Sequence, residues 1–184
     1  MVHLVTLSGS PSTSSKTLTV VDYIRETARH KGWKTDLIQV RNFPSEDLLY
    51  ARFDSPSIQE AVSLLKQADG VLIATPVYKA SYTGVLKAFL DLMPQDVLSG
   101  KVVWPIAVGG TLAHLLVLEY ALKPVLSALG ARNIQQGVYI QDSQIHSRHR
   151  GEVVLDGQVK ERIAEGFRQF EVALGQSSLV GETE

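Results

Sequence analysis

Residues 2–17 of the chain read VHLVTLSGSPSTSSKT, an apolar run followed at once by a loop of small and hydroxyl-bearing residues. Val2–Leu7 fits a buried strand, because it is a short run of aliphatic and β-branched residues that ends in turn chemistry. A helical pattern follows over Lys16–His30, with serines near its start as candidate N-caps. This order of strand, loop and helix predicts the first unit of an α/β domain.

The rest of the chain repeats this alternation. Lys34–Val40 is a more polar strand that suits an outer position, and further strands are expected at Gly70–Thr75, Lys101–Val108 and Asn133–Ile140, with helices at Ser57–Gln67, Gly84–Leu92, Leu112–Leu129 and Leu155–Leu174. Apolar strands must be covered on both faces and parallel strands need long crossovers, so the pattern predicts a five-stranded parallel sheet with helices on both faces. Five units are too few for an eight-stranded barrel. The open doubly wound sheet remains, and it binds ligands at the carboxyl ends of its strands.

The composition excludes several classes of protein. Charged residues form 20% of the chain and leave a formal net charge of -1, which argues against nucleic acid as a partner and favours a small molecule. The absence of cysteine excludes thiol nucleophiles, disulfides, iron–sulfur clusters and thiolate zinc sites. Any redox chemistry must therefore use a cofactor, and we assign no metal site.

The length of 184 residues suits one domain. We expect this domain over residues 1–174, followed by a small and polar tail over residues 175–184 that we expect to be flexible. The N-terminal strand is not preceded by the basic segment of a secretory signal, and no apolar run approaches the about 20 residues that cross a bilayer. We therefore expect a cytoplasmic protein with no membrane partner.

The loop Ser8–Thr17 has the chemistry of a phosphate site. Hydroxyls and backbone N–H groups converge there on a helix N-terminus, whose partial positive charge favours anions. A nucleotide-hydrolase P-loop does not fit, because Ser14 and Ser15 occupy the places of its second glycine and its lysine, and the dinucleotide fingerprint G-x-G-x-x-G is absent. A Ser-rich turn with an ordinary N-cap is the alternative. The candidate phosphate-binding residues are Ser8, Ser10, Ser12, Ser15, Lys16 and Thr17.

The loops after the third and fourth strands have residues suited to a flat ring. A flavin ring needs an apolar or aromatic wall and backbone N–H groups facing its polar edge. Gly109 and Gly110 let the backbone approach a ring closely. As alternatives, a tyrosine in a loop often only packs against its neighbours, and a lone histidine on a helix is often only solvated. Lys87 and Asp91 are read as a surface helix pair. The candidate ring-binding residues are Pro76, Val77, Tyr78, Lys79, Ser81, Gly109, Gly110, Thr111 and His114.

These three loops together resemble the NAD(P)H-dependent FMN reductase family, whose phosphate loop reads G-S-x-R-x-x-S and whose second motif reads P-x-Y-x-x-S-x-x-G-x-L-K. The second motif is matched completely, from Pro76 to Lys87, whereas Ser12 stands in place of the arginine of the first. The resemblance implies a flavodoxin-like fold with strand order 2-1-3-4-5, binding of FMN, and NADPH or NADH as the electron donor. The phosphate charge must then be met by Lys16, backbone groups or hydroxyls.

The resemblance extends to the branch of the family that serves alkanesulfonate utilisation, through Asp47–Pro56, Ala113–Leu116 and Tyr120–Leu129, and it covers residues 2–145. It implies that reduced FMN leaves for a partner flavin-dependent monooxygenase. It also implies a homodimer or homotetramer, and a π-bulge at Tyr120 that controls flavin release at a subunit interface. Pro124 independently predicts a local irregularity in this helix, because proline cannot donate to the preceding turn.

Four alternatives remain for these features. Tyr120 could be an aromatic side chain packed beside a proline kink, and the segment 41–56 could be an ordinary surface loop or an oligomer contact. An enzyme that keeps its FMN could reduce quinones or azo dyes. A flavodoxin-like electron carrier is disfavoured by the near-neutral charge, because carriers that dock by charge are usually strongly acidic. No catalytic acid or base is assigned, since hydride transfer depends on alignment of two rings.

Overall fold

The computed structural model describes residues 1–149 and 152–180 and has a central, mostly parallel sheet. Its order is β2-β1-β3-β5-β6, and β7 continues beside β5 where β6 ends. The prediction of a doubly wound parallel sheet is confirmed, with the fifth position divided between two short strands. The strands are β1 (His3–Ser8), β2 (Lys34–Gln39), β3 (Gly70–Tyr78), β5 (Val102–Gly109), β6 (Asn133–Ile134) and β7 (Val138–Gln141).

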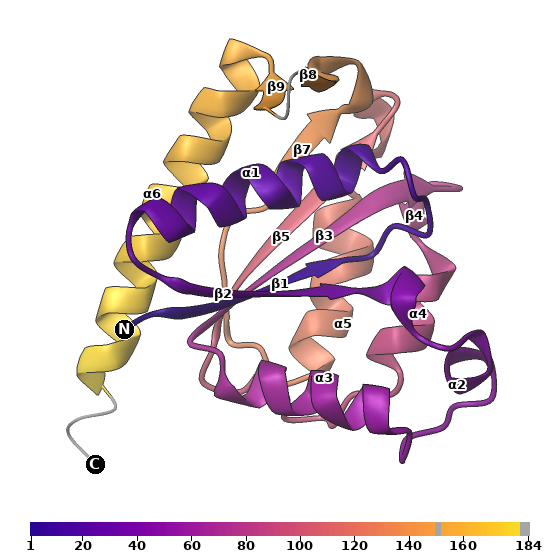
Figure 1. The fold of residues 1–184 in the computed structure, drawn as a ribbon. Helices are drawn as coiled ribbons and strands as arrows, with labels where there is room; N and C mark the ends of the chain where they lie inside the picture. The colour runs from indigo at the N-terminus through magenta and orange to yellow at the C-terminus, as the bar shows by residue number, and fades with distance from the viewer. Residues whose placement is uncertain (150–151, 181–184) are drawn as a thin grey trace.

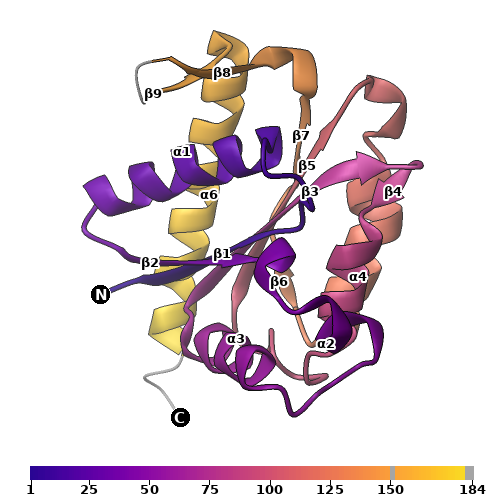
Figure 2. The ribbon, with the colours of Figure 1, turned by 45° about the vertical axis from the view of Figure 1, so that its right-hand side comes forward.

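Helices cover the two faces of this sheet in separate layers (Figure 1). Helices α1 (Lys16–His30) and α6 (Gly157–Val180) lie on one face, and α3 (Pro56–Gln67), α4 (Gly84–Leu90) and α5 (Lys123–Ala128) lie on the other, as the turned view in Figure 2 also shows. Successive side chains of a strand point alternately into the two helical layers. In β3, Val71 and Ile73 join the α3 side, whereas Leu72 and Ala74 join the α1 side.

The core under α1 and α6 is built around aromatic rings. Trp104 of β5 is fully buried and packs against Phe167 and Phe170 of α6, and Trp33 stacks on Phe167 with ring centroids 5.1 Å apart. Gly166 is required beside Trp104, because a Cβ there would lie 2.5 Å from the indole. This packing fixes α6 along the sheet, although α6 comes last in the chain.

Several boundaries differ from those expected from the sequence. The helix expected at Leu112–Leu129 is divided into a 3-10 turn (Leu112–His114), a π-helical turn (Leu118–Leu122) and α5. The strand expected at Asn133–Ile140 is interrupted: β6 ends at Ile134 and β7 begins at Val138, and between them Gly137 packs against Leu118. The helix expected to end at Leu174 continues to Val180, and residues 181–184 of the expected tail lie outside the described residues.

Short elements fill the remaining connections. A hairpin of β8 (Ile145–His149) and β9 (Glu152–Leu155) packs on α1 at the top of Figure 1. The connection after β2 contains a 3-10 turn (Val40–Asn42) and α2 (Ser45–Leu49), and β3 is paired with the antiparallel strand β4 (Ser81–Tyr82). Within the described residues, no helix is both long and apolar enough to span a membrane.

Candidate active site

The loop between β1 and α1 is organised by its own hydroxyl groups. Ser10 Oγ accepts a hydrogen bond from Ser12 N, and Ser12 Oγ accepts one from Ser14 N, each at 3.2 Å. Ser15 is the N-cap of α1, and its side chain accepts from Leu18 N at 3.0 Å. The first turn of α1 has no acidic residue, so no carboxylate there offsets the partial positive charge of the helix N-terminus that faces the loop. This geometry suits a phosphate group.

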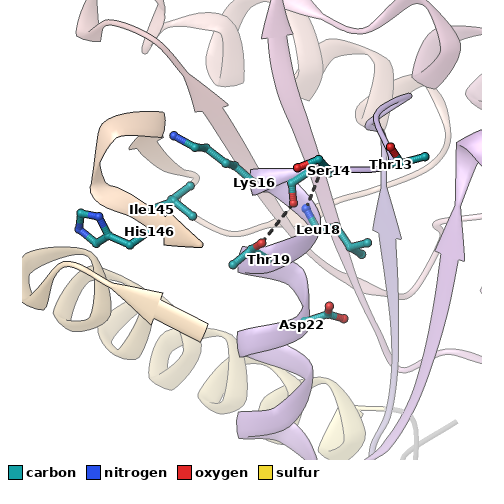
Figure 3. Close-up of a pocket in the computed structure, with 9 residues that line it drawn as sticks. Thr13, Ser14, Lys16, Leu18, Thr19, Asp22, Ile145 and His146 are labelled. Carbon is teal, nitrogen blue, oxygen red and sulfur yellow. Dashed lines mark hydrogen bonds between the residues drawn. The ribbon is translucent and has the colours of Figure 1, made fainter. Parts of the chain in front are cut away.

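Lys16 does not extend over this loop. Its Nζ donates to the carbonyl of Asp142, 2.5 Å away, in the turn before β8. Figure 3 shows the side chain extending away from Thr13, toward the segment that carries Ile145 and His146. The open pocket there, of about 430 Å³, lies between the start of α1 and the β8–β9 hairpin, and it is lined by Thr13, Ser14, Ser15, Lys16, Leu18, Thr19, Asp22, Ile145 and His146.

A buried threonine ties the phosphate loop to the next loop of the sheet. Thr83, the N-cap of α4, donates from Oγ1 to Gly9 O at 2.6 Å and accepts from Leu86 N at 3.2 Å. Gly9 also donates its N–H to Ala74 O (2.7 Å). A side chain at Gly9 would meet Leu86 at 2.9 Å, so this close approach requires glycine. Thr83 is not among the candidate residues predicted from the sequence, and it directly precedes the helix expected at Gly84–Leu92.

The second loop is a hairpin extension of the sheet. Strand β3 continues past Thr75 through Pro76 and Val77 to Tyr78, and β4 pairs back with Val77 opposite Tyr82. Lys79 and Ala80 form the turn with φ values of 50° and 64°. Two positive φ values in a two-residue turn are typical of a type I′ hairpin, which glycine and asparagine favour. The turn therefore stores strain beside Tyr78, whose side chain is 49% exposed.

The third loop, Gly109–Thr111, is held by a residue of the neighbouring strand. Tyr139 of β7 donates from its hydroxyl to Thr111 O at 2.6 Å, and a Cβ at Gly109 would overlap this hydroxyl. Burial raises the pKa of Tyr139 above its ordinary value of 10.0, and Asp142 adds to this effect. A Cβ at Gly109 would also lie 3.2 Å from Val77, so the second and third loops are in contact. No sequence motif singled out Tyr139.

The structure brings most of the predicted residues to one edge of the sheet. Pairing of Ser8 with Ala74 and of Pro76 with Val108 places the ends of β1, β3 and β5 side by side. Lys87 and Asp91 form the expected surface ion pair at 2.6 Å. Of the candidates, Ser8, Ser10, Thr17 and Gly109 are buried, Ser12, Ser15, Pro76, Val77, Ser81 and His114 are half-buried, and Lys16, Tyr78, Lys79, Gly110 and Thr111 are exposed.

The π-helical turn lies near the third loop and presents an aromatic side chain outward. Tyr120 stands in the middle of Leu118–Leu122 and is 79% exposed. Pro124 follows in the first turn of α5, two residues after this π-helical turn ends. The irregularity expected around Pro124 is therefore present in the backbone. Leu112, Leu115 and Leu116 are also exposed and extend this apolar surface.

A second apolar surface is presented by the end of α2 and the segment that follows it. Buried Asp47 accepts hydrogen bonds from the hydroxyls of Ser55 and Ser57 and lies 3.6 Å from the Arg52 guanidinium. These contacts close residues 47–57 into a compact loop. Leu49, Tyr50 and Phe53 project from it and are exposed.

Known proteins match this chain over the region that contains the three loop motifs. The model of the NADPH-dependent FMN reductase family matches residues 2–145. This chain belongs to that family. It is 44% identical over 174 residues to the FMN reductase (NADPH) of Pseudomonas putida KT2440, covering 94% of this chain and 88% of the relative, and 50% identical over 148 residues to the FMN reductase (NADPH) of Escherichia coli K12, covering 80% and 78%.

A solved structure supports the same assignment. The apo form of an NADH:FMN oxidoreductase (EMOB) superposes with a TM-score of 0.84 at 34% identity, covering 94% of this chain and 90% of the other. The chain is therefore an NAD(P)H-dependent FMN reductase of flavodoxin-like fold, with FMN and NAD(P)H as its substrate and cofactor. The geometry fits FMN, because the acid-free start of α1 suits its phosphate and the space open at Gly110 lets the backbone approach a ring.

Proposed function

We propose that this FMN reductase uses FMN as an exchanging substrate and supplies the reduced flavin to a partner flavin-dependent monooxygenase in alkanesulfonate sulfur acquisition. The observation that carries the proposal is the openness of the site. Tyr78, Gly110 and Thr111 are exposed. A site with exposed walls buries little of a ligand and retains it weakly. Flavin can then leave in each cycle.

The site residues divide into two groups under this proposal. Ser8, Ser10, Ser12, Ser15, Lys16 and Thr17 belong to the phosphate loop, and Pro76, Val77, Tyr78, Lys79, Ser81, Gly109, Gly110, Thr111 and His114 belong to the loops around the ring. FMN supplies the acceptor for the hydride of NAD(P)H. The chain contributes alignment of the two rings and backbone groups at the flavin edge, and it needs no general acid or base.

The electron donor is NADPH in this proposal. Two relatives that are 44% and 50% identical carry the name FMN reductase (NADPH), whereas the similar solved structure is named for NADH. The ratio of kcat/KM for the two nucleotides, measured with saturating FMN, tests this choice. A ratio that favours NADH would contradict it.

Subunit association is the second part of the proposal. Monomeric proteins rarely expose large contiguous apolar patches, and this chain presents Leu112, Leu115, Leu116 and Tyr120 from one region and Leu49, Tyr50 and Phe53 from another. We assign these surfaces to a homodimer or homotetramer, with the tetramer expected, in which Tyr120 controls flavin release. Light scattering tests the assembly. A monomeric mass would contradict it, and so would a Tyr120→Ala variant with unchanged mass and unchanged flavin release.

The alternative enzyme keeps its FMN and reduces a quinone or an azo dye. Gel filtration of protein mixed with FMN separates the two cases, because an exchanging flavin is lost from the protein peak whereas a prosthetic flavin stays with it. The supply role is tested by adding a flavin-dependent monooxygenase encoded by a neighbouring gene, together with an alkanesulfonate, NADPH and FMN. Release of sulfite supports the sulfur role, and sustained flavin reduction without sulfite would contradict it.

A further inference from the structure

The phosphate loop lacks an obvious positive charge. The family motif has an arginine at the position of Ser12, and the nearest lysine in sequence, Lys16, is bound to Asp142 O on the far side of the α1 start. A flavin phosphate carries up to two negative charges, and hydroxyls and N–H groups alone leave them unneutralised. A cation at this edge of the sheet would supply the missing charge.

Arg41 is placed to supply that charge. Strands β1 and β2 are parallel, with Ser8 paired to Gln39, so the segments that follow them leave the sheet at the same edge. Arg41 stands in the 3-10 turn directly after β2, and its Nε donates to Pro11 O of the phosphate loop at 3.4 Å. These two residues are 30 positions apart in the chain. The contact therefore depends on the pairing of the strands.

The guanidinium of Arg41 is available for a ligand. Among the residues that the structure describes, no carboxylate forms an ion pair with it, whereas Arg25, Arg29, Arg52 and Arg168 each have an acidic partner. Its side chain is exposed. With Nε engaged by the loop carbonyl, the two terminal nitrogens remain to donate, and a planar pair of donors matches two phosphate oxygens.

We propose that Arg41 binds the 5′-phosphate of FMN and replaces the arginine that the family motif places at position 12. The contact to Pro11 O holds Nε at the loop, and the terminal nitrogens face the anion. The proposal rests on the phosphate site proposed above. It assigns to the 3-10 turn after β2 a role in distinguishing FMN from a flavin without a phosphate.

The test compares FMN with riboflavin, which has the same ring and no phosphate. Binding to purified apoprotein is followed by the change in flavin fluorescence. Arg41→Ala is expected to raise the Kd for FMN about tenfold, as one charge-assisted hydrogen-bonded contact at an exposed site is lost, and to leave the Kd for riboflavin unchanged. Arg41→Lys keeps the charge without the planar pair of donors and is expected to lie between the two.

Two further variants control the interpretation. Arg132→Ala removes an exposed arginine that precedes β6, at the opposite edge of the sheet, and is expected to leave both affinities unchanged. Ser12→Arg in the Arg41→Ala background restores the arginine of the family motif and is expected to recover most of the lost FMN affinity. Thermal unfolding of each variant checks that the fold is intact.

The outcomes separate the two levels of the proposal. If wild-type protein binds FMN no more tightly than riboflavin, the phosphate site itself is wrong. If wild-type protein prefers FMN and Arg41→Ala keeps that preference, the site stands and the role of Arg41 is overturned. Equal weakening of FMN and riboflavin would also overturn it, because it would show that Arg41 only supports the shape of the loop through Pro11.

Discussion

Substitution of Thr83 by valine tests how the phosphate loop is attached to the sheet. Valine has nearly the shape of threonine, so the change removes the hydroxyl without opening a cavity. The Thr83 side chain is about 1% exposed, donates to Gly9 O and caps α4 through Leu86 N. Both hydrogen bonds are lost together, at a position closed to bulk solvent.

The expected magnitude is the sum of two effects. Loss of an N-cap hydroxyl costs about 1 kcal/mol. A buried carbonyl left without its donor, here Gly9 O, costs about 1–3 kcal/mol more. The free energy of unfolding should therefore fall by about 2–4 kcal/mol in Thr83→Val. FMN binding should weaken as well, because Gly9 opens the phosphate loop.

Urea denaturation of apoprotein measures the first effect, and flavin fluorescence measures the second. Thr83→Ser retains the hydroxyl and should lie within about 1 kcal/mol of wild type, since it loses one buried methyl group. Ser15→Ala removes the N-cap of α1 without a second buried contact and provides the stability control. A free energy of unfolding that falls no further in Thr83→Val than in Ser15→Ala would refute the argument, because the hydrogen bond from Thr83 to Gly9 O would then contribute nothing to stability.

Other substitutions test the second and third loops. Ala80→Gly relieves a positive φ in the β3–β4 turn and should raise the free energy of unfolding, measured by urea denaturation, by about 0.5–1 kcal/mol. Ala88→Gly, inside α4, should lower it. Destabilisation by both substitutions would contradict the assignment of strain. Tyr139→Phe removes the bond to Thr111 O and should raise the KM for FMN with little change in kcat; a fall in kcat alone would contradict this role. Because the pKa of Tyr139 is raised above 10.0 in the folded state, its contribution to stability is complete below pH 10.0 and is lost as the pH rises through the folded pKa. The Tyr139→Phe variant should lack this loss in alkaline denaturation, and identical alkaline profiles for the two proteins would contradict it.

The parallel sheet was predictable because its strands are buried on both faces. Val71, Leu72 and Ile73 are consecutive and all lie in the core, and an unbroken apolar run of this length between turn residues is typical of a central parallel strand. The β8–β9 hairpin was not predicted, since His146, Ser147 and Arg148 lack the apolar alternation of a strand. The β3–β4 hairpin was missed for a different reason. Its turn is Lys79–Ala80, and neither residue is typical of a turn with positive φ.

The candidate site was predictable only in its loops. Sequence motifs identified residues that are neighbours in the chain, such as Ser8–Thr17 and Pro76–Tyr78. Other contacts of the site join residues far apart in the chain and follow from strand pairing. Thr83 donates to Gly9 O, Tyr139 donates to Thr111 O, and Arg41 donates to Pro11 O. Lys16 shows the converse. Its place in the loop suggested a phosphate contact, whereas in the structure its Nζ donates a hydrogen bond to Asp142 O.

The central claim, that FMN is an exchanging substrate, is tested most directly by an anaerobic titration. Purified apoprotein is mixed with a large excess of FMN over subunits, and oxidation of NADPH is followed to completion. The account predicts that NADPH oxidised equals total FMN and that the flavin separates from the protein on gel filtration afterwards. Oxidation that stops at the FMN bound to the subunits, with the flavin retained on the protein, would contradict it.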